Sequence, residues 1–477
     1  MTLPTDISKL ESLVESLLSQ VASLEQQVQR LQAENQALKE ENAQFRGQLS
    51  QNSHNSHLPP SSDRFSSKPA FTAKKGGKRG GQQGHQGQTL EMNAHPDELI
   101  ELLPPSHCTC GADLSQTPSY LLERRQVVDL PPTQLLVVEY QQYACQCPHC
   151  GQEAKSDFPA RLPARIQYGV GVKSLLSLLS VHYHLSYSRI SDLFNHLFGQ
   201  PINASTIISA NQYLYQALAA SEEAIQERLL QEAVVNFDET GLAVQGKTSW
   251  LHTASTPLLT YLFVHSQRGL AALQSSDSLL KDFTGWAVHD CWQAYFAFSQ
   301  CRHALCGAHL LRELQALIEQ ASQWATQMHT FLLKVYQQSD KGKGQVADLN
   351  PYLREYEQIC ALAQQEEPPP QASKHGKAKA SKGRNLLQRL VKHQDSVLAF
   401  ASQDFIPFTN NQAERDIRPA KSKLKNAGCF RTLTGAKHYA RIQGFISTAR
   451  KQGKNLLQEL KNACLGFTFL TQPNLTS

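Results

Sequence analysis

The chain has 477 residues, a net charge of +5 and 40% hydrophobic residues, enough for two or three domains and at least one large core. No apolar run is long enough to span a bilayer and the N-terminus lacks the layout of a signal peptide, so we expect a cytoplasmic protein. Eleven cysteines in such a protein indicate metal ligands and reduced thiols, and argue against a disulfide scaffold.

Residues 8–50 carry a seven-residue hydrophobic repeat. One set of positions holds Val14, Val21, Val28, Asn35, Asn42 and Leu49, and the other holds Leu10, Leu17, Leu24, Leu31, Leu38 and Phe45. Valine and leucine in these places favour two parallel helices, and a buried asparagine prefers an amide partner. The repeat predicts a coiled-coil dimerisation helix, because one amphipathic helix on a globular core would not keep a heptad period for so long.

Residues 51–92 are expected to form a basic flexible linker. From Arg64 to Leu90 there are six Lys and Arg, many Gly and Gln, and no acid, so the segment cannot bury a core. Non-specific contact with a nucleic-acid backbone and a merely solvated linker explain this composition equally well.

Residues 93–160 contain two tight cysteine pairs, each followed by glycine. The intervening segments 121–130 and 133–143 have strand character. Paired thiols in knuckle turns are typical of a structural zinc ribbon, so the pattern predicts bound Zn²⁺, with plain reduced thiols as the alternative. The predicted ligands are Cys108, Cys110, Cys147 and Cys150. Because the first pair is tighter than usual, His107 or Cys145 could replace one of them.

Residues 161–230 have a helical pattern. A helix, a turn at Gly199 and Pro201, and a cap at Asn203 or Ser205 before another helix resemble a helix-turn-helix. We therefore expect a DNA-binding region here, although short helix pairs also occur in ordinary helical domains.

Three separate acids have the character of metal ligands. Apolar runs end at Asp238 and at Asp290, and the segments after Asp238 continue as strands of a sheet. A third acid, Glu414 or Asp416, lies in a cationic stretch, and residues 417–458 contain ten Lys and Arg but no Asp or Glu. Such a set can hold two Mg²⁺ ions about 4 Å apart for phosphodiester chemistry. A strand-end aspartate can also simply cap a turn, and spacing does not choose between the two later acids.

The segment before the third acid is expected to be helical. Residues 312–338 and 351–365 predict helices within an insertion of about 312–400. Asn410 and Asn411 can cap the short helix that bears Glu414, and Pro419 is expected to end it. Lys421 and Lys423 would then reach DNA phosphates from the following turn.

Several motifs together resemble the insertion-sequence sixty-six family of bacterial transposases, and the resemblance covers nearly the whole chain. They are NFDETG, GKTSWLHTAST, AVHDCWQAYF, HALCGAHLLREL, PFTNNQAERDIRP and GCFRTLTGAKHYARIQGFISTARKQGKN. The resemblance implies a DDE catalytic core of RNase H-like fold in residues 231–445, with a helical tail in 446–477. It implies Asp238, Asp290 and Glu414 as the catalytic, Mg²⁺-binding triad, and so selects Glu414 over Asp416.

The same resemblance extends to neighbouring residues. Cys306 and His309 occupy a Cys-x-x-His pair of the family; they could bind a metal as accessory residues or be a packed thiol and a hydrogen-bonded imidazole. Cys291 and Leu310 depart from the more frequent family residues, outside the triad. The expected DNA-binding residues are Arg415, Arg418, Lys421, Lys423, Lys425 and Arg431.

Taken together, the sequence predicts a multidomain α+β protein that works as a homodimeric, nucleoid-associated DNA transposase. It would cleave and join DNA at the ends of an insertion sequence and at a target, with Mg²⁺ and Zn²⁺ as cofactors, and companion proteins of the same element are possible partners. A metal-dependent nuclease with the same triad and a non-catalytic DNA-binding dimer are the alternatives. Strand joining would separate the transposase from both.

Overall fold

The computed structural model describes residues 7–49, 90–131, 133–159, 161–341, 346, 348–370 and 380–471. The predicted linker lies outside these residues except for positions 90–92. The chain divides into two compact units. The smaller unit comprises Phe65–Phe158 and Asn195–Gln200, and the larger comprises Met1–Arg64, Pro159–Phe194 and Pro201–Ser477. Each described helix is too short or too polar to cross a bilayer.

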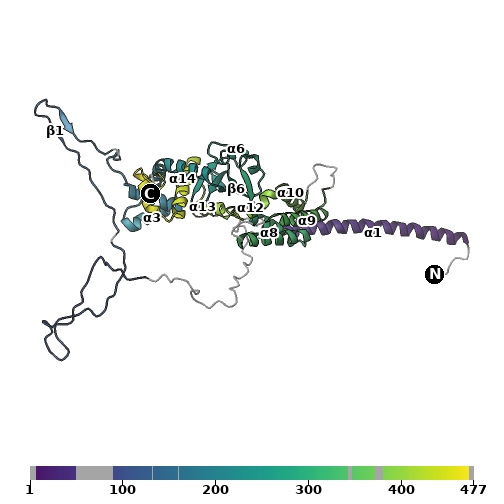
Figure 1. Ribbon diagram of the computed structural model, residues 1–477, viewed down its shortest axis with the longest axis horizontal. Coiled ribbons are helices and arrows are strands. Elements are labelled where there is room, and N and C mark those ends of the chain that lie inside the picture. The colour runs from purple at the N-terminus through teal and green to yellow at the C-terminus, as the bar shows by residue number, and fades with distance from the viewer. Residues whose placement is uncertain are drawn as a thin grey trace. The chain divides into compact units, whose positions relative to one another are not determined.

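The predicted N-terminal helix is present as α1, which runs without a break over Ile7–Leu49 (Figure 1). Where the structure describes their side chains, its heptad valines and leucines are open to solvent, with Val21 50% and Leu24 59% exposed. A row of exposed valine and leucine needs a covering surface, which a second copy of the helix can provide. The pairing itself stays a prediction.

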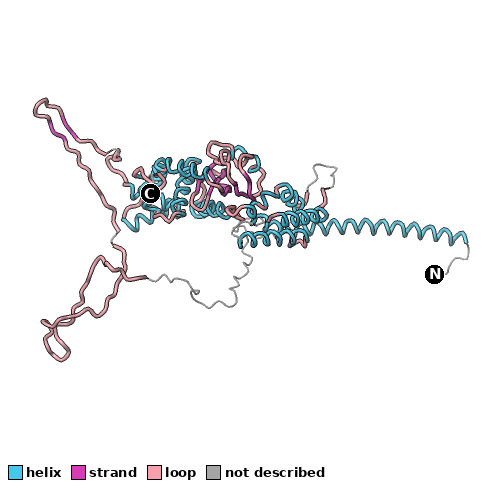
Figure 2. The backbone as a smooth tube through the Cα atoms, in the orientation of Figure 1, coloured by secondary structure: helices cyan, strands magenta, loops and turns pink. Residues whose placement is uncertain are grey.

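A five-stranded mixed sheet occupies the middle of the larger unit (Figure 2). Its strands are β3 (Val234–Val244), β4 (Lys247–Ser255), β5 (Thr260–His265), β6 (Trp286–His289) and β7 (Arg302–Leu305). The spatial order is β5-β4-β3-β6-β7. Strands β3, β4 and β5 form an antiparallel meander, and β6 and β7 continue the sheet in the same direction as β3. The sheet between Asp238 and Asp290 that the sequence predicts is therefore confirmed, and so is the mixed α+β class.

The β3–β4 hairpin is closed by a two-residue turn. Val244 pairs with Lys247, and the intervening Gln245 and Gly246 both have positive φ angles, 52° and 74°. Such a turn matches the twist of the flanking strands, and glycine adopts this conformation without steric cost. The tight turn fixes the register of β3, on which Asp238 lies.

The helices expected in 161–230 are also present. They are α2 (Val170–Ser177), a short π-helical turn η2 (Leu178–His182), α3 (Tyr187–Phe198), α4 (Ala204–Ala217) and α5 (Ala219–Gln231). Helices α4 and α5 share one core with the sheet; Leu214 and Leu229 pack with Val235 and Leu251 of the strands. Whether α3 and α4 read DNA stays a prediction.

The chain after the sheet returns to cover it. Helix α13 (Asn411–Ala427) packs against β3 and β4, and α14 (Leu433–Lys451) packs against β5. Position 445, where the sequence places the end of the catalytic core, lies inside α14, which is followed by α15 (Leu456–Cys464). Shorter elements complete the unit: α6 (Leu270–Leu273) and a 3₁₀ turn η3 (Tyr295–Ala297).

Among the described residues six helices lie between β7 and α13, in agreement with the predicted helical insertion. They are α7 (Gly307–Ile318), α8 (Gln323–Lys341), α9 (Asn350–Glu366), α10 (Lys382–Lys392), α11 (Gln394–Val397) and α12 (Ala399–Ser402). The prediction of one helix over 312–338 is wrong, because the chain turns between α7 and α8, where Ala321 has a φ of 64°. Glu366 stabilises the break by accepting hydrogen bonds from the first amides of α8 at 3.1 and 3.0 Å.

The insertion is anchored to the sheet through a second core. Trp324, Phe331 and Tyr356 pack in one buried cluster with Val288 and Leu305 of the two parallel strands. Such a core holds the insertion as part of the domain rather than as a loose appendage.

The start of α7 depends on close packing against the segment before α13. The amide of Gly307 donates to the carbonyl of Phe408 at 2.8 Å. A Cβ at position 307 would lie 2.3 Å from the Phe408 ring, which is stacked on Tyr336 and meets Phe400 edge-on.

Gly307→Ala is therefore expected to lower the stability of the larger unit by about 1–3 kcal/mol, the usual cost of overpacking a core. Thermal unfolding followed by circular dichroism measures the change. Gly171→Ala is the matched control, since the atom nearest to its added Cβ is 3.7 Å away, and its melting temperature should be unchanged or slightly higher. Equal melting temperatures for both variants would contradict the packing argument.

Candidate active site

Asp238 lies within β3, and Asp290 follows the last residue of β6. The parallel pairing of these strands ends at Asn236 and Val288, and each aspartate comes two residues later. Because the strands run in the same direction and in register, both aspartates lie at the same level of the sheet. The expectation that Asp238 ends its strand is wrong, since β3 continues along β4 to Val244; what ends before Asp238 is the pairing with β6.

Asp238 is surrounded by other acids. Burial raises its pKa well above the usual range, and the negative charges of Glu239, Asp290 and Glu414 raise it further. Burial and Asp290 also raise the pKa of Glu239, but its carboxylate accepts hydrogen bonds from Arg268 at 2.7 Å and from the Tyr295 hydroxyl at 2.5 Å. The Arg268 and Tyr295 bonds offset part of this rise for Glu239, and its charge still contributes to the repulsion at Asp238.

The third acid, Glu414, is held near the sheet by the residue that precedes α13. The Asn410 side-chain amide donates to the carbonyl of Phe237 at 2.7 Å, and its oxygen accepts from the Asn236 amide at 2.9 Å. Asn410 is at the N-cap position, as predicted, but its side chain binds β3 and makes no capping bond. Sequence reasoning did not identify Asn236 and Asn410 as positioning residues. The available signal was an asparagine two residues before Asp238 and another four residues before Glu414, which carries little information.

The structure separates Glu414 from its neighbour Asp416. Asp416 is buried and its carboxylate binds Lys451 at 2.6 Å, Gln412 at 2.9 Å and Ser447 at 3.2 Å. Its oxygens are therefore used to join α13 to α14. Glu414, in the first turn of the same helix, has no contact of this strength in the described part of the chain: its nearest cations are Arg312 at 3.5 Å and Arg418 at 3.7 Å.

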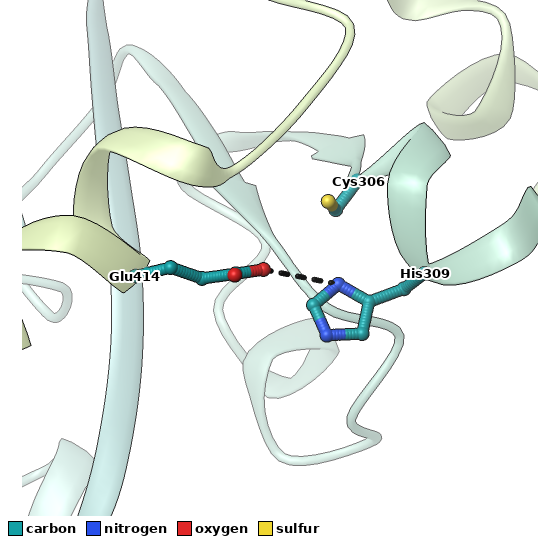
Figure 3. Close-up of side chains that lie close together, drawn as sticks. All are labelled: Cys306, His309 and Glu414. Carbon is teal, nitrogen blue, oxygen red and sulfur yellow. Dashed lines mark ion pairs between the residues drawn. The ribbon is translucent and has the colours of Figure 1, made fainter. Parts of the chain in front are cut away.

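Glu414 also lies beside the Cys-x-x-His pair (Figure 3). Cys306 is the N-cap residue of α7 and His309 is in its first turn. One ligand atom each from Cys306, His309 and Glu414 lie within 4.8 Å of one another, and His309 Nδ1 is 3.8 Å from Glu414 Oε1. Among the described residues no other three His, Cys, Asp or Glu side chains meet this criterion. The three predicted catalytic acids, although electrostatically coupled, do not converge to that distance.

The cations of α13 form an exposed stripe, opposite to the buried face of the helix. Arg415, Arg418, Lys421 and Lys425 recur at helical spacing. The prediction that Pro419 ends the helix is wrong: α13 continues to Ala427, because burial of Ala413, Ile417 and Ala420 against the sheet offsets the hydrogen bond that proline cannot make.

Two lysines consequently differ from the expectation that they project from a turn. Lys421 Nζ donates to the Gly241 carbonyl at 2.9 Å, and Lys423 Nζ donates to the Gly428 carbonyl at 2.9 Å. Lys423 also lies 3.6 Å above the Phe430 ring, and burial lowers its pKa to about 8. Arg431 is exposed just beyond the helix. DNA contact by these six cations stays a prediction.

The predicted zinc ligands lie in the smaller unit, in two separate turns. The carbonyl of Cys108 accepts a hydrogen bond from the amide of Gly111, and the carbonyl of Cys147 accepts one from the amide of Gly151. Both distances are 2.8 Å, as in knuckle turns. Hydrogen bonds with Cys110 lower the pKa of the Cys108 thiol, and hydrogen bonds with Cys150 lower the pKa of the Cys147 thiol. Within the described residues the four sulfurs do not gather around one point, so the ribbon stays a prediction.

The predicted strands of the ribbon are largely wrong. Segments 121–130 and 133–143 form no paired strand, and the hairpin consists of β1 (Ala144–Gln146) and β2 (Glu153–Lys155) around the second knuckle. Residues such as Leu122 and Val127 have strand character but are 86% and 90% exposed. A high β-propensity yields a strand only where a partner strand and a surface to pack against exist.

The contrast between the two acids of α13 can be measured. Asp416→Asn leaves the buried Lys451 ammonium without its counter-charge and should cost about 3–5 kcal/mol of stability. Glu414→Gln weakens three contacts longer than 3.4 Å, to His309, Arg312 and Arg418, and should change stability by less than about 1 kcal/mol. Urea unfolding of both variants tests this; a destabilised Glu414→Gln with an unaffected Asp416→Asn would reverse the assigned roles.

Comparison with known families bears on the whole site. A family model described as Transposase IS66 family matches residues 165–438, more than half of the chain. A second model, described as a family of unknown function (DUF6444), matches residues 5–91. No curated protein matches the chain. The first match contains β3, β6, α7 and α13, and with them the three predicted acids and the Cys306–His309 pair beside Glu414. The chain belongs to the IS66 family of transposases.

Proposed function

We propose that the chain is a DDE-type DNA transposase whose catalytic acids are Asp238, Asp290 and Glu414. The observation that carries the proposal is the coupling of these acids. Two follow the last paired residues of adjacent parallel strands, and the negative charge of the third acts on the first. Membership of a transposase family supports DNA as the substrate.

The sheet supports the RNase H-like core that the sequence resemblance implies. An antiparallel meander extended by two strands parallel to its first strand places the end of β6 beside the part of β3 that carries Asp238. Helix α13, which carries Glu414, packs against β3 and β4, so it approaches the sheet at the strand that carries Asp238.

The donor set fits a hard divalent cation. Carboxylate oxygens are the ligands that Mg²⁺ prefers, and a cation would relieve the repulsion that raises the pKa of Asp238. Bound Mg²⁺ supplies activation of the attacking hydroxyl and stabilisation of the leaving oxygen of a phosphodiester. Asp238 and Asp290 would hold the two predicted Mg²⁺ ions from the sheet and Glu414 would hold them from α13; the three acids, whose ligand atoms do not all lie within 4.8 Å of one another, would have to draw closer to do so.

The proposed reaction exchanges one phosphodiester for another. Water first releases a 3′-hydroxyl at the element end, and that hydroxyl then attacks target DNA, where one bond forms as another breaks. No covalent bond to the protein is needed. The stripe of Arg415, Arg418, Lys421 and Lys425 would contact the DNA backbone, since cations on one face of a helix neutralise successive phosphates.

Glu414→Gln is expected to keep DNA binding and to lower strand transfer by at least about 100-fold, the cost of losing one preorganised charged group. The assay uses purified chain, labelled element ends, Mg²⁺ and a target plasmid. Glu355→Gln is the control, because Glu355 pairs with Lys334 on the insertion helices at 2.7 Å. Strand transfer that survives Glu414→Gln would remove its assigned role.

The same assay separates the alternatives. Cleavage of the labelled ends without joining would indicate a metal-dependent nuclease. Binding without either step in the unsubstituted chain would leave a non-catalytic DNA-binding dimer.

We also propose that α1 joins two chains. Leu24→Lys places a charge in the predicted heptad seam, whereas Gln26→Lys places the same charge on the outside of the helix. Sedimentation should show a monomer for Leu24→Lys and a dimer for Gln26→Lys. A Leu24→Lys variant that remains dimeric at the same concentration would contradict the coiled coil.

A further inference from the structure

Glu414 has a second set of neighbours besides the aspartates. The Cys306 sulfur, an imidazole nitrogen of His309 and a Glu414 oxygen all lie within 4.8 Å of one another (Figure 3). Cys306 is 1% exposed, while the side chains of His309 and Glu414 are 18% and 19% exposed. The three groups thus line a site that is closed at the sulfur and open to solvent at the imidazole and the carboxylate.

Backbone hydrogen bonds fix this arrangement. The amide of Asn410 donates to the Cys306 sulfur at 3.1 Å, and the amide of Gly307 donates to the Phe408 carbonyl at 2.8 Å. The segment that leads into Glu414 is therefore tied at two points to the turn that carries Cys306. Because His309 lies in the first turn of the same helix, its place follows from that of Cys306.

The donor set differs in kind from that of the aspartates. Mg²⁺ takes oxygen ligands, whereas a thiolate and an imidazole suit Zn²⁺ and similar divalent transition metals. Around Zn²⁺ the ligand atoms stand about 3.3–3.7 Å apart, so the observed group needs to contract by only about 1 Å. Three protein ligands leave a fourth position for water, as in open zinc sites.

We propose that Cys306, His309 and Glu414 form a second metal site, for Zn²⁺ or a similar transition-metal ion, which shares Glu414 with the Mg²⁺ site. When the metal–sulfur bond forms, the Cys306 thiol releases its proton to solvent. A carboxylate held by this ion is withdrawn from Asp238 and Asp290, so the ion inhibits DNA cleavage. Metal binding stands on the geometry alone, whereas inhibition rests on the proposed function.

The surrounding charges limit the affinity. Arg312 at 3.5 Å and Arg418 at 3.7 Å already offset part of the Glu414 charge. The site is therefore weaker than a four-ligand structural zinc site, which suits an ion that can leave when the carboxylate is needed.

Cobalt spectroscopy tests the binding. The parent is the full chain with Cys108→Ser, Cys110→Ser, Cys147→Ser and Cys150→Ser, which removes the thiols of the two knuckle turns. Titration with Co²⁺ should give a sulfur-to-cobalt charge-transfer band at about one equivalent. Cys306→Ser should abolish the band, and His309→Ala should weaken Co²⁺ binding by at least about tenfold, since loss of even an outer partner costs roughly 10–100-fold.

A matched thiol controls for non-specific binding. Cys301 is also buried, and its sulfur is 4.0 Å from His303, but no third ligand completes that pair among the described residues. Cys301→Ser should leave the band unchanged. A band that survives Cys306→Ser, or a parent chain without a band, overturns the proposal and leaves His309 as a residue that only orients Glu414.

Inhibition provides the second readout. Mg²⁺-dependent cleavage by the parent chain should fall as Zn²⁺ is added, and the Cys306→Ser variant should need at least about tenfold more Zn²⁺ for the same fractional loss, relative to its own activity without Zn²⁺. Equal sensitivity overturns the shared-carboxylate mechanism. A chain that binds Co²⁺ but cleaves no DNA would contradict the proposed function and leave the metal site in place.

Discussion

The close approach of like-charged carboxylates is the constraint on which the rest of the structure depends. Burial raises the pKa of Asp238, and the charges of Glu239, Asp290 and Glu414 raise it further. Carboxylates that repel one another stay near each other only where the rest of the fold holds them in place. The scaffold here is the parallel pairing of β3 with β6, and the asparagine pair, Asn236 with Asn410, that binds the start of α13 to β3.

Two cores supply the stability that this arrangement needs. The first core joins strands β3–β5 to helices before and after them in the chain, such as α4, α5 and α14. The second core joins the described insertion helices to β6 and β7. Glu414 lies after the second core and on a helix that packs on the first. Its position therefore depends on both cores. Two residues away, the buried Asp416–Lys451 pair ties α13 to α14. The structural carboxylate, Asp416, and the proposed catalytic carboxylate, Glu414, occupy one helix but serve different interfaces.

The sequence predicted elements well where the signal is local. Heptads gave α1, apolar runs gave β3 to β6, and the two aspartates at the ends of those runs come together in the structure. It failed where distant packing overrides a local rule. Pro419 does not end α13, because three apolar residues of that helix are buried on the sheet. Likewise, residues 121–130 have strand composition but no paired neighbour.

The least predictable feature is the relation of Cys306 to Glu414, since more than one hundred residues separate a ligand pair from its third member. Spacing shows only that Cys306 and His309 share a helix face. The backbone amide of Asn410 donates to the Cys306 sulfur, and the side-chain amide of Asn410 donates to the Phe237 carbonyl of β3. Asn410 thus links the thiol and the sheet to the start of the helix that carries Glu414. A hydroxyl could accept that amide bond as well as a thiol does, so holding α13 in place does not by itself require cysteine. A thiol buried to this degree also packs as a small apolar side chain, and the proposed metal site adds a second reason for sulfur, its affinity for transition metals.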